Sequence, residues 1–269
     1  MHPLASEVLA GFIGGSAKTL ALYPLDTLTT LRELRIRPSR ALSQYYRGCG
    51  LTLLGLAPYA IIFHTAFYVC DAALTDVMPA AARQMCAGLF GSVASAFVGV
   101  PFECLKHRLQ VSAPMYATPQ MALANTIRLE GVRGLFSGFG STLARNAPYN
   151  ALHFGIFAAV SRTAGSIAHG RAADALAGAV AGALTALLTT PLDLVNTRLQ
   201  TQAVRAVQHG GPQYAGVCDA LVRIAAEEGG PSALMQGSLV RVAQYAPASI
   251  IFFMCYQAVK CRLQEPRGI

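Results

Sequence analysis

Three basic residues, Lys18, Arg145 and Arg241, fall inside segments of the chain that are otherwise apolar. An ionisable side chain in an apolar segment is costly to bury, so each is a candidate for a functional role. A guanidinium there needs an anionic partner, and a carboxylate on a small solute can supply one through two parallel hydrogen bonds. The residues therefore predict binding of a carboxylate-bearing solute, with Arg145 as the strongest candidate.

Patterns typical of catalysis or of metal binding are missing from the chain. It has no G-x-S-x-G or H-E-x-x-H motif and no glycine loop of the kind that cradles phosphates. Its seven cysteines show no C-x-x-C and no paired spacing, which indicates neither a zinc site nor a disulfide framework. We expect no enzyme, no cofactor and no metal site.

The composition is typical of a membrane protein. Of the 269 residues, 54% are hydrophobic and only 13% are charged, whereas a soluble domain has about a quarter of its residues charged. The length is enough for about six spans of roughly 20 residues each. The net charge of +8 suits an anionic membrane surface or anionic solutes. The basic residues lie in separate loops without a recognisable binding module, so nucleic acid is not indicated.

An internal repeat organises the chain. Three segments place an acidic residue two positions after a proline: YPLDTLTTLRE from Tyr23, VPFECLKHRLQ from Val100 and TPLDLVNTRLQ from Thr190. A second proline motif (APYAIIF, APYNALHF, APASIIF) follows each segment, and the next acidic motif begins at the same distance in both cases. Such periodicity predicts a repeat architecture. The predicted repeats are residues 1–78, 79–168 and 169–269.

Each repeat is expected to hold two long helices. Their internal prolines would break a helix in water, but neighbouring helices in a membrane can satisfy the freed backbone groups, so we interpret the prolines as kinks. Basic residues gather in the three long loops, which places those loops in the matrix or the cytosol. The expected helices lie near residues 6–33, 50–76, 82–110, 137–163, 172–202 and 234–262. The predicted fold is thus an all-α membrane protein with six transmembrane helices in three pseudosymmetric repeats.

The repeated pattern of proline, any residue, acid, two residues, base, any residue, base resembles the signature of the mitochondrial carrier family. The resemblance covers nearly the whole chain. It implies a six-helix bundle around a water-filled cavity, alternating access, and a place in the mitochondrial inner membrane. EGVRGLFSG from Glu130 resembles the family's matrix-helix motif and EGGPSALMQG from Glu228 is a looser version, whereas repeat one has only YRG from Tyr46. We expect a shortened first matrix helix.

The resemblance implies a gate at the matrix side of the cavity. Each acid of the signature would face the basic position of the first helix in the next repeat. The acids are Asp26, Glu103 and Asp193, and the positions that they face are Lys106, Asn196 and Thr29. Only the first pair can form an ion pair in this register, so we expect a weakened gate with two hydrogen bonds in place of ion pairs. Glutamine braces are expected at Gln110 and Gln200, and Glu33 replaces the first brace.

Two further sets of positions follow from the resemblance. At the opposite side, the family's aromatic-acid-x-x-base motif keeps no ion pair in its own register, which predicts a poorly latched outer gate. Its positions here include Tyr68, Asp71, Gln257 and Lys260, with Asp71 and Gln257 as the best remaining contact. Solute contacts in the family lie about one turn before the proline of each repeat's second helix. The matched positions are Gly55 and Leu56, Arg145 and Asn146, and Gln244 and Tyr245, with Lys18 and Arg241 as further candidates.

Four functions stay open at this point. The overall length, the short first loop and the stretches VPFECLKHRLQVSA and GSTLAR resemble family members that carry S-adenosylmethionine, which implies exchange for S-adenosylhomocysteine. Arg145 with Asn146 is similar to carriers of keto acids and other carboxylates, and NAPYNALHF with RVAQYAP to the iron-carrying mitoferrins. A carrier fold that serves as a scaffold without transport is the fourth. The expected partners are the solute and membrane lipids, including cardiolipin at the matrix helices, and a monomer would suffice.

Overall fold

Long helices dominate the chain in its computed structural model, which describes residues 3–38, 41–75, 77–111, 114–164, 171–210, 212–245, 247–248, 251 and 254–255. Five of them are α1 (Pro3–Glu33), α2 (Cys49–Ala73), α3 (Ala80–Gln110), α5 (Phe139–Ala164) and α6 (Arg171–His209). Residues 238–245, called the C-terminal stretch below, are helical too and belong to the sixth expected helix. The described residues contain no strand. The all-α prediction is confirmed.

The prolines lie inside the long helices without ending them, as expected for helices supported by neighbours in a membrane. They are Pro24, Pro58, Pro101, Pro148 and Pro191. Within the described ranges, three stretches are long and apolar enough to cross a membrane by length and composition. These stretches are Leu42–Ala73, Cys86–Gln110 and Gly178–Val207.

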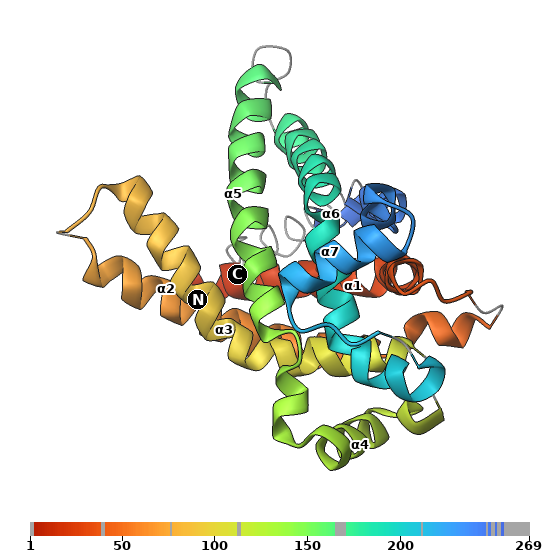
Figure 1. Ribbon diagram of the computed structural model, residues 1–269. Helices are drawn as coiled ribbons and strands as arrows, with labels where there is room; N and C mark the ends of the chain where they lie inside the picture. Colours follow the sequence, from red (N-terminus) through yellow and green to blue (C-terminus); the bar gives the residue numbers. More distant parts are fainter. Residues whose placement is uncertain are drawn as a thin grey trace.

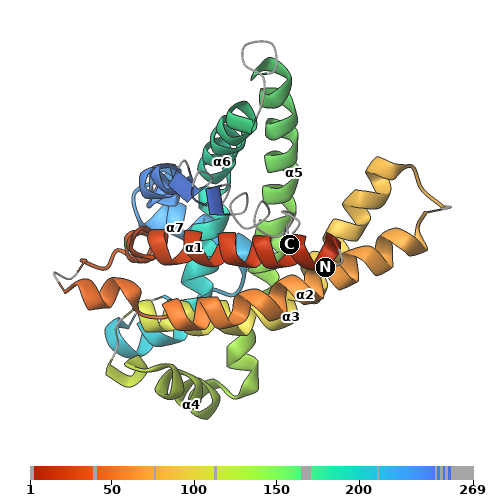
Figure 2. The ribbon, with the colours of Figure 1, turned by 180° about the vertical axis from the view of Figure 1, so that it is seen from behind.

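The long helices form neighbouring pairs that spread apart from one end of the molecule. Helix α2 packs along α3, and α5 packs along α6. The two pairs point in different directions in Figure 1 and, from behind, in Figure 2. They converge where the carboxyl ends of α1, α3 and α6 meet. The bundle is therefore closed at that end and splayed at the other.

Short helices lie at the closed end. Helix α4 (Pro119–Glu130) follows α3, after the 3₁₀ turn η2 (Pro114–Tyr116), and helix α7 (Val217–Glu227) follows α6. Each is succeeded by a further 3₁₀ turn, η3 (Val132–Phe136) or η4 (Pro231–Met235). In repeat one, the described residues between α1 and α2 contain only the 3₁₀ turn η1 (Leu42–Tyr46). The first matrix helix is thus reduced to one turn, in line with the sequence.

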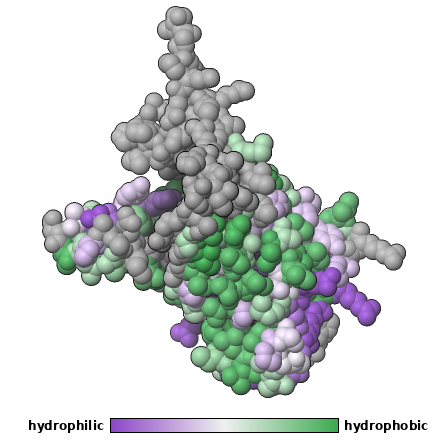
Figure 3. Space-filling model, turned by 90° about the horizontal axis from the view of Figure 1, so that it is seen from above, coloured by the Kyte–Doolittle hydropathy of each residue, from purple (hydrophilic) through white to green (hydrophobic). Residues whose placement is uncertain are grey.

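The buried apolar core lies at the closed end as well. One cluster joins the end of α3 to α4, and a second joins α6 to α7. Large apolar side chains elsewhere on the long helices point outward, among them Leu54, Phe90 and Leu188. Figure 3 shows hydrophobic side chains over much of the described face that it presents. Exposed apolar surface of this extent is typical of contact with lipid.

Two fully buried arginines fasten the loop helices to the bundle. Arg108 on α3 forms a two-pronged ion pair with Glu130 at the end of α4, with Nη2 2.9 Å from Oε2. Arg198 on α6 binds Glu228 just after α7 in the same way, also at 2.9 Å. Burial alone would raise the pKa of Glu228, but the hydrogen bond and charge of Arg198 hold that pKa below its usual value. The equivalent position in repeat one is Leu31, and the described residues between α1 and α2 contain no α-helix to be fastened there.

We expect Glu130→Ala to destabilise the protein by about 3 kcal/mol, because it leaves the buried Arg108 guanidinium without its carboxylate. Thermal unfolding of the purified protein in detergent measures this loss. Glu227→Ala is the matched control, since the Glu227 carboxylate pairs with Arg223 on the surface at 3.0 Å, and its Tm should stay nearly unchanged. Equal losses in the two variants would show that the buried pair is not what holds α4.

Candidate functional site

A cavity of about 340 Å³ lies between the long helices, next to the closed end of the bundle. Helices α1, α3, α5 and α6 and the C-terminal stretch all contribute to its wall. Four carboxylates and four basic side chains face it, together with threonines and three tyrosines. The charged residues are Asp26, Glu33, Glu103 and Asp193, and Lys18, Lys106, Arg145 and Arg241. Charges buried at this density must be paired or hydrated, so their partners decide what the site can do.

The ion pair expected between Asp26 and Lys106 is present. Lys106 Nζ lies 2.6 Å from Asp26 Oδ2 and so links α3 to α1. Gln110 donates to the same carboxylate oxygen at 3.3 Å and to the Thr27 hydroxyl at 3.1 Å. The Lys106 ammonium also lies over the ring of Tyr23, 5.7 Å from its centroid. Charge, a cation–π contact and the glutamine brace thus hold this pair together.

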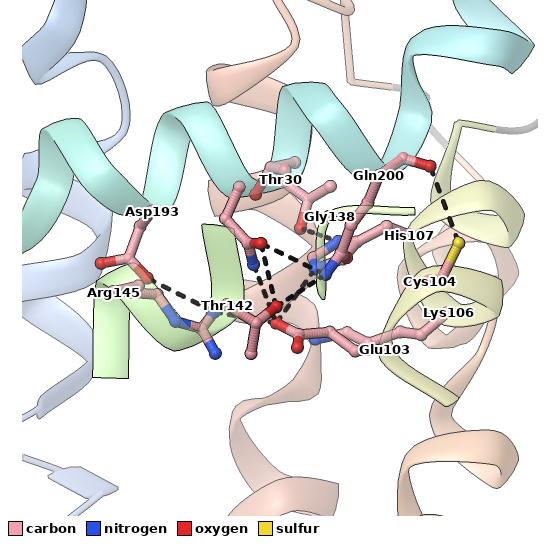
Figure 4. A network of polar contacts seen from close by, with 12 residues as sticks. Thr30, Glu103, Cys104, Lys106, His107, Gly138, Thr142, Arg145, Asp193 and Gln200 are labelled. Carbon is pink, nitrogen blue, oxygen red and sulfur yellow. Dashed lines mark hydrogen bonds and ion pairs between the residues drawn. The ribbon is translucent and has the colours of Figure 1, made fainter. Parts of the chain in front are cut away.

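Glu103 takes its cation from α5, a helix outside the signature. Arg145 donates from Nη1 to Glu103 Oε1 at 2.8 Å. The expected partner, Asn196 on α6, donates to the same oxygen at 3.3 Å, and the Nε2 atom of His107 lies 3.8 Å from it. Figure 4 shows Arg145, Glu103 and His107 in one connected polar network. A single carboxylate oxygen therefore joins α3, α5 and α6.

Asp193 is paired with two arginines, and both come from second helices of repeats. Arg241 on the C-terminal stretch forms an ion pair with Asp193 Oδ2. Arg145 Nη1 lies 3.6 Å from Oδ1 of the same carboxylate, and Figure 4 shows the two side chains pointing toward each other. Thr29, the partner expected from the sequence, instead donates its hydroxyl to the Leu25 carbonyl on its own helix at 3.0 Å.

The prediction that only Asp26 would form an ion pair is wrong, and with it the expectation of a weakened gate. All three signature acids are ion-paired in the structure. Arg145 and Arg241 replace the bases missing from the signature of repeats one and three. An arginine on an adjacent helix can do this because its side chain is long and its five donors can serve two carboxylates at once.

Arg145 is not the unpaired cation that the sequence suggested. Its guanidinium contacts Glu103 and Asp193, and its Nε donates to the Asn146 side chain at 3.2 Å. A solute carboxylate would therefore have to compete with two protein carboxylates. Among the cavity's cations, Lys18 is the one for which the described part of the chain provides no ion pair. It is half-buried on α1, about two turns before Asp26.

The other predicted solute contacts divide into two groups. Gln244 and Tyr245 line the cavity, as Lys18 and Arg241 do. Gly55, Leu56 and Asn146 do not line it. Gly55 is buried against the ring of Phe102, where an added Cβ would lie 2.9 Å from the ring's Cγ. This glycine therefore serves close helix packing, and its prediction as a solute contact was wrong, because position in a helix does not reveal which face a neighbour covers.

Tyr149 and His107 line the cavity without having been predicted to do so. The hydroxyl oxygens of Tyr149 and Tyr245 are 2.9 Å apart, so the two form a joint aromatic wall. His107 Nδ1 lies 3.4 Å from the Thr30 hydroxyl, between α3 and α1. The available signal for Tyr149 was its spacing of four residues from Arg145, which places both on one helix face.

The second predicted brace has different partners from the first. Gln200 donates to Thr142 and to Asn196 at 3.4 Å each, so it supports the hydrogen-bonded side of the network.

At the outer side, Asp71 pairs with Arg83 across the α2–α3 connection, at 2.7 Å, and Tyr68 is exposed. Gln257 and Lys260 lie outside the described residues, so the outer gate stays a prediction.

Comparisons with known proteins agree with this architecture. The family described as mitochondrial carrier protein matches residues 79–166 and 169–267. S-adenosylmethionine carrier 1, chloroplastic/mitochondrial, of Arabidopsis thaliana is 32% identical, over 96% of this chain and 79% of its own length. The mitochondrial S-adenosylmethionine carrier protein of Xenopus tropicalis is 32% identical, over 95% of each chain. The mitochondrial 2-oxodicarboxylate carrier 2 of Saccharomyces cerevisiae is 27% identical, over 94% of this chain and 92% of its own length.

We expect Arg241→Gln to weaken the closed end of the bundle, because Asp193 then keeps only the longer contact with Arg145. The loss should be about 2–3 kcal/mol, visible as a lower Tm of the purified protein in detergent.

The second substitution Thr29→Lys should restore much of that stability, since it returns a base to the position that the family signature pairs with Asp193. Thr75→Lys, at an exposed position after α2, is the control for adding a lysine. If Thr75→Lys rescued the variant as well as Thr29→Lys did, the pairing of Asp193 would not be the cause.

Proposed function

The chain belongs to the mitochondrial carrier family, and on that premise we propose that it exchanges S-adenosylmethionine for S-adenosylhomocysteine by alternating access in the mitochondrial inner membrane. Two relatives named as S-adenosylmethionine carriers match it over nearly its whole length. The bundle is closed at the end with the loop helices and splayed at the other, which is the arrangement that a carrier open to one side requires. Members of this family are transporters, and we assign the chain no catalytic step.

The chemistry of the cavity wall is the observation that carries this proposal. S-adenosylmethionine has a carboxylate, an ammonium and a sulfonium group, and an adenine ring. Lys18 is available for the carboxylate, and the cavity acids offer counter-charges for the two cationic groups. Tyr149 and Tyr245 present aromatic rings and hydroxyls on which adenine can pack and hydrogen-bond. A single cavity thus contains a partner for each part of the solute.

Arg145 gives a physical link between solute binding and gate opening. Its ion pair with Glu103 ties α5 to α3 at the closed end. A solute carboxylate that reaches Arg145 competes with Glu103, so the gate contact is exchanged for a solute contact. Because one ion pair replaces another, the free-energy difference between closed and open states stays within the few kcal/mol that a population shift can span.

The proposal includes one chain as the transport unit, because residues of all three repeats line the same cavity. It also includes lipid around the apolar outer face, and cardiolipin at the matrix loops. The predicted division at residues 78 and 168 follows the same threefold pattern.

A small dicarboxylate is the second candidate solute. The three cations Lys18, Arg145 and Arg241 around the cavity favour it, and so does the likeness to the yeast relative named as a 2-oxodicarboxylate carrier. Iron is less favoured, since no group of three or more His, Cys, Asp or Glu in the described ranges could hold a metal. A scaffold without transport would have no need of three paired gate acids.

Purified protein in liposomes loaded with S-adenosylhomocysteine should take up labelled S-adenosylmethionine. We expect Arg145→Ala to reduce the initial rate about a hundredfold, because it leaves the Glu103 carboxylate without its arginine and removes the coupling to the gate. Lys18→Ala should reduce it about tenfold through weaker solute binding, with KM raised more than the maximal rate is lowered.

Arg223→Ala on the exposed face of α7 is the control and should transport as the wild type does. Uptake of 2-oxodicarboxylates without uptake of S-adenosylmethionine would replace the first candidate by the second. Uptake of neither would leave the scaffold as the remaining function.

A further inference from the structure

Glu33 differs from the other acids of the cavity. It is 3% exposed, at the end of α1, and it lines the cavity floor. Its Oε2 accepts a hydrogen bond of 2.6 Å from the Thr197 hydroxyl on α6. Asp26, Glu103 and Asp193 each lie in an ion pair, but Glu33 pairs with no basic side chain among the described residues. It is therefore the one cavity carboxyl whose protonation would break no ion pair.

The equivalent positions in the other repeats are occupied by amides. Glu33, Gln110 and Gln200 stand at the same distance after the signature proline of their repeats. The two glutamines donate hydrogen bonds to side chains beneath the cavity. A protonated carboxyl resembles an amide, since it has one acceptor oxygen and one donor group, whereas a carboxylate only accepts. Repeat one thus has a titratable group, Glu33, at the position where the other two repeats have the neutral donors Gln110 and Gln200.

Both acidic and basic side chains surround Glu33. Gly237, just before the C-terminal stretch, packs against the Glu33 side chain. The charged and titratable groups near it are Asp26 on its own helix, Lys106 and His107 on α3, Asp193 and Arg198 on α6, and Arg241 on the C-terminal stretch. Asp193 already holds Arg241, Asp26 holds Lys106, and Glu228 holds Arg198. These neighbouring cations are committed to other acids, which leaves Glu33 without an ion pair in the described part of the chain.

We propose that Glu33 is a proton-carrying site that couples solute exchange to the movement of one proton. The inference rests on the proposed function and adds a co-transported ion to it. With the bundle open to one side, a proton from that side forms an O–H bond at the Glu33 carboxylate. When the closed end opens, that bond breaks and the proton leaves to the other compartment.

The charges of the two solutes give this proton a role. S-adenosylmethionine carries a net charge of one positive unit, and S-adenosylhomocysteine, which lacks the sulfonium, carries none. Glu33 is ionised when the cationic solute is bound and protonated when the neutral solute is bound. Exchange of S-adenosylmethionine for S-adenosylhomocysteine plus one proton then moves no net charge across the membrane.

The test uses the full chain in liposomes loaded with S-adenosylhomocysteine, and measures accumulation of labelled S-adenosylmethionine. For the wild type, each unit by which the lumen is more acidic than the outside should raise the accumulation ratio about tenfold, and a membrane potential should not change it. Glu33→Gln should lose the response to pH. It should gain a response to an inside-negative potential, about tenfold for every 60 mV.

Two variants distinguish the loss of the Glu33 proton site from misfolding and from titration of the neighbouring histidine. Glu33→Asp keeps a titratable group and should keep the response to pH. This variant shows that substitution at position 33 does not by itself misfold the protein, so loss of the pH response in Glu33→Gln reports loss of the titratable group. His107→Gln removes the histidine that lines the cavity and should also keep the response. A wild type driven by potential and not by pH, or a Glu33→Gln variant that still responds to pH, would overturn the proposal.

Infrared spectra of the solute-free protein test the proton site apart from the solute. A protonated-carboxyl band in the wild type that is absent from Glu33→Gln supports the site, even if S-adenosylmethionine is not transported. Absence of that band from the wild type across the pH range in which the protein is folded would overturn the site, even if S-adenosylmethionine is transported.

Discussion

A carboxylate that faces a membrane-embedded cavity needs a cation or a proton, and the cavity of this protein is organised around that requirement. Three acids of the repeated signature point to its floor, yet two of the positions that face them hold Thr29 and Asn196. Arg145 and Arg241 supply the missing charges from other helices. The closed end is therefore held by electrostatic pairing between helices, even though the signature itself has lost two of its bases.

In the proposed mechanism, gate and solute chemistry lie in the same side chains. In the register of the signature, the bases that close the gate belong to the first helices of the repeats. Here two of these bases, Arg145 and Arg241, stand on the second helices of their repeats, at or near the positions where the family contacts its solutes. In that mechanism a solute that binds Arg145 displaces Glu103, so recognition and opening become one exchange of partners. Lys18 and the tyrosine wall are left for contacts that do not disturb the gate.

Repeat one departs from the threefold pattern in several linked ways. Leu31 stands where the other repeats have the buried Arg108 and Arg198. The loop that follows has no acid that could pair there, and its described residues form no matrix α-helix. Loss of the arginine and loss of its carboxylate belong together, because either charge alone would be buried without a partner. In the same repeat, Glu33 replaces a glutamine and brings a titratable group to the cavity.

The sequence by itself determined the family, the all-α class, the long helices and the ion pair of Asp26 with Lys106, because hydrophobic periodicity and repeated motifs depend on neighbours along the chain. It also indicated the short first loop. Only the tertiary structure decided which cation serves Glu103 and Asp193, that Gly55 packs against Phe102, and that Glu33 faces the cavity with no ion pair to any described residue. Those outcomes depend on which side chains of different helices come within a few ångströms, and a motif's own register contains no such distances.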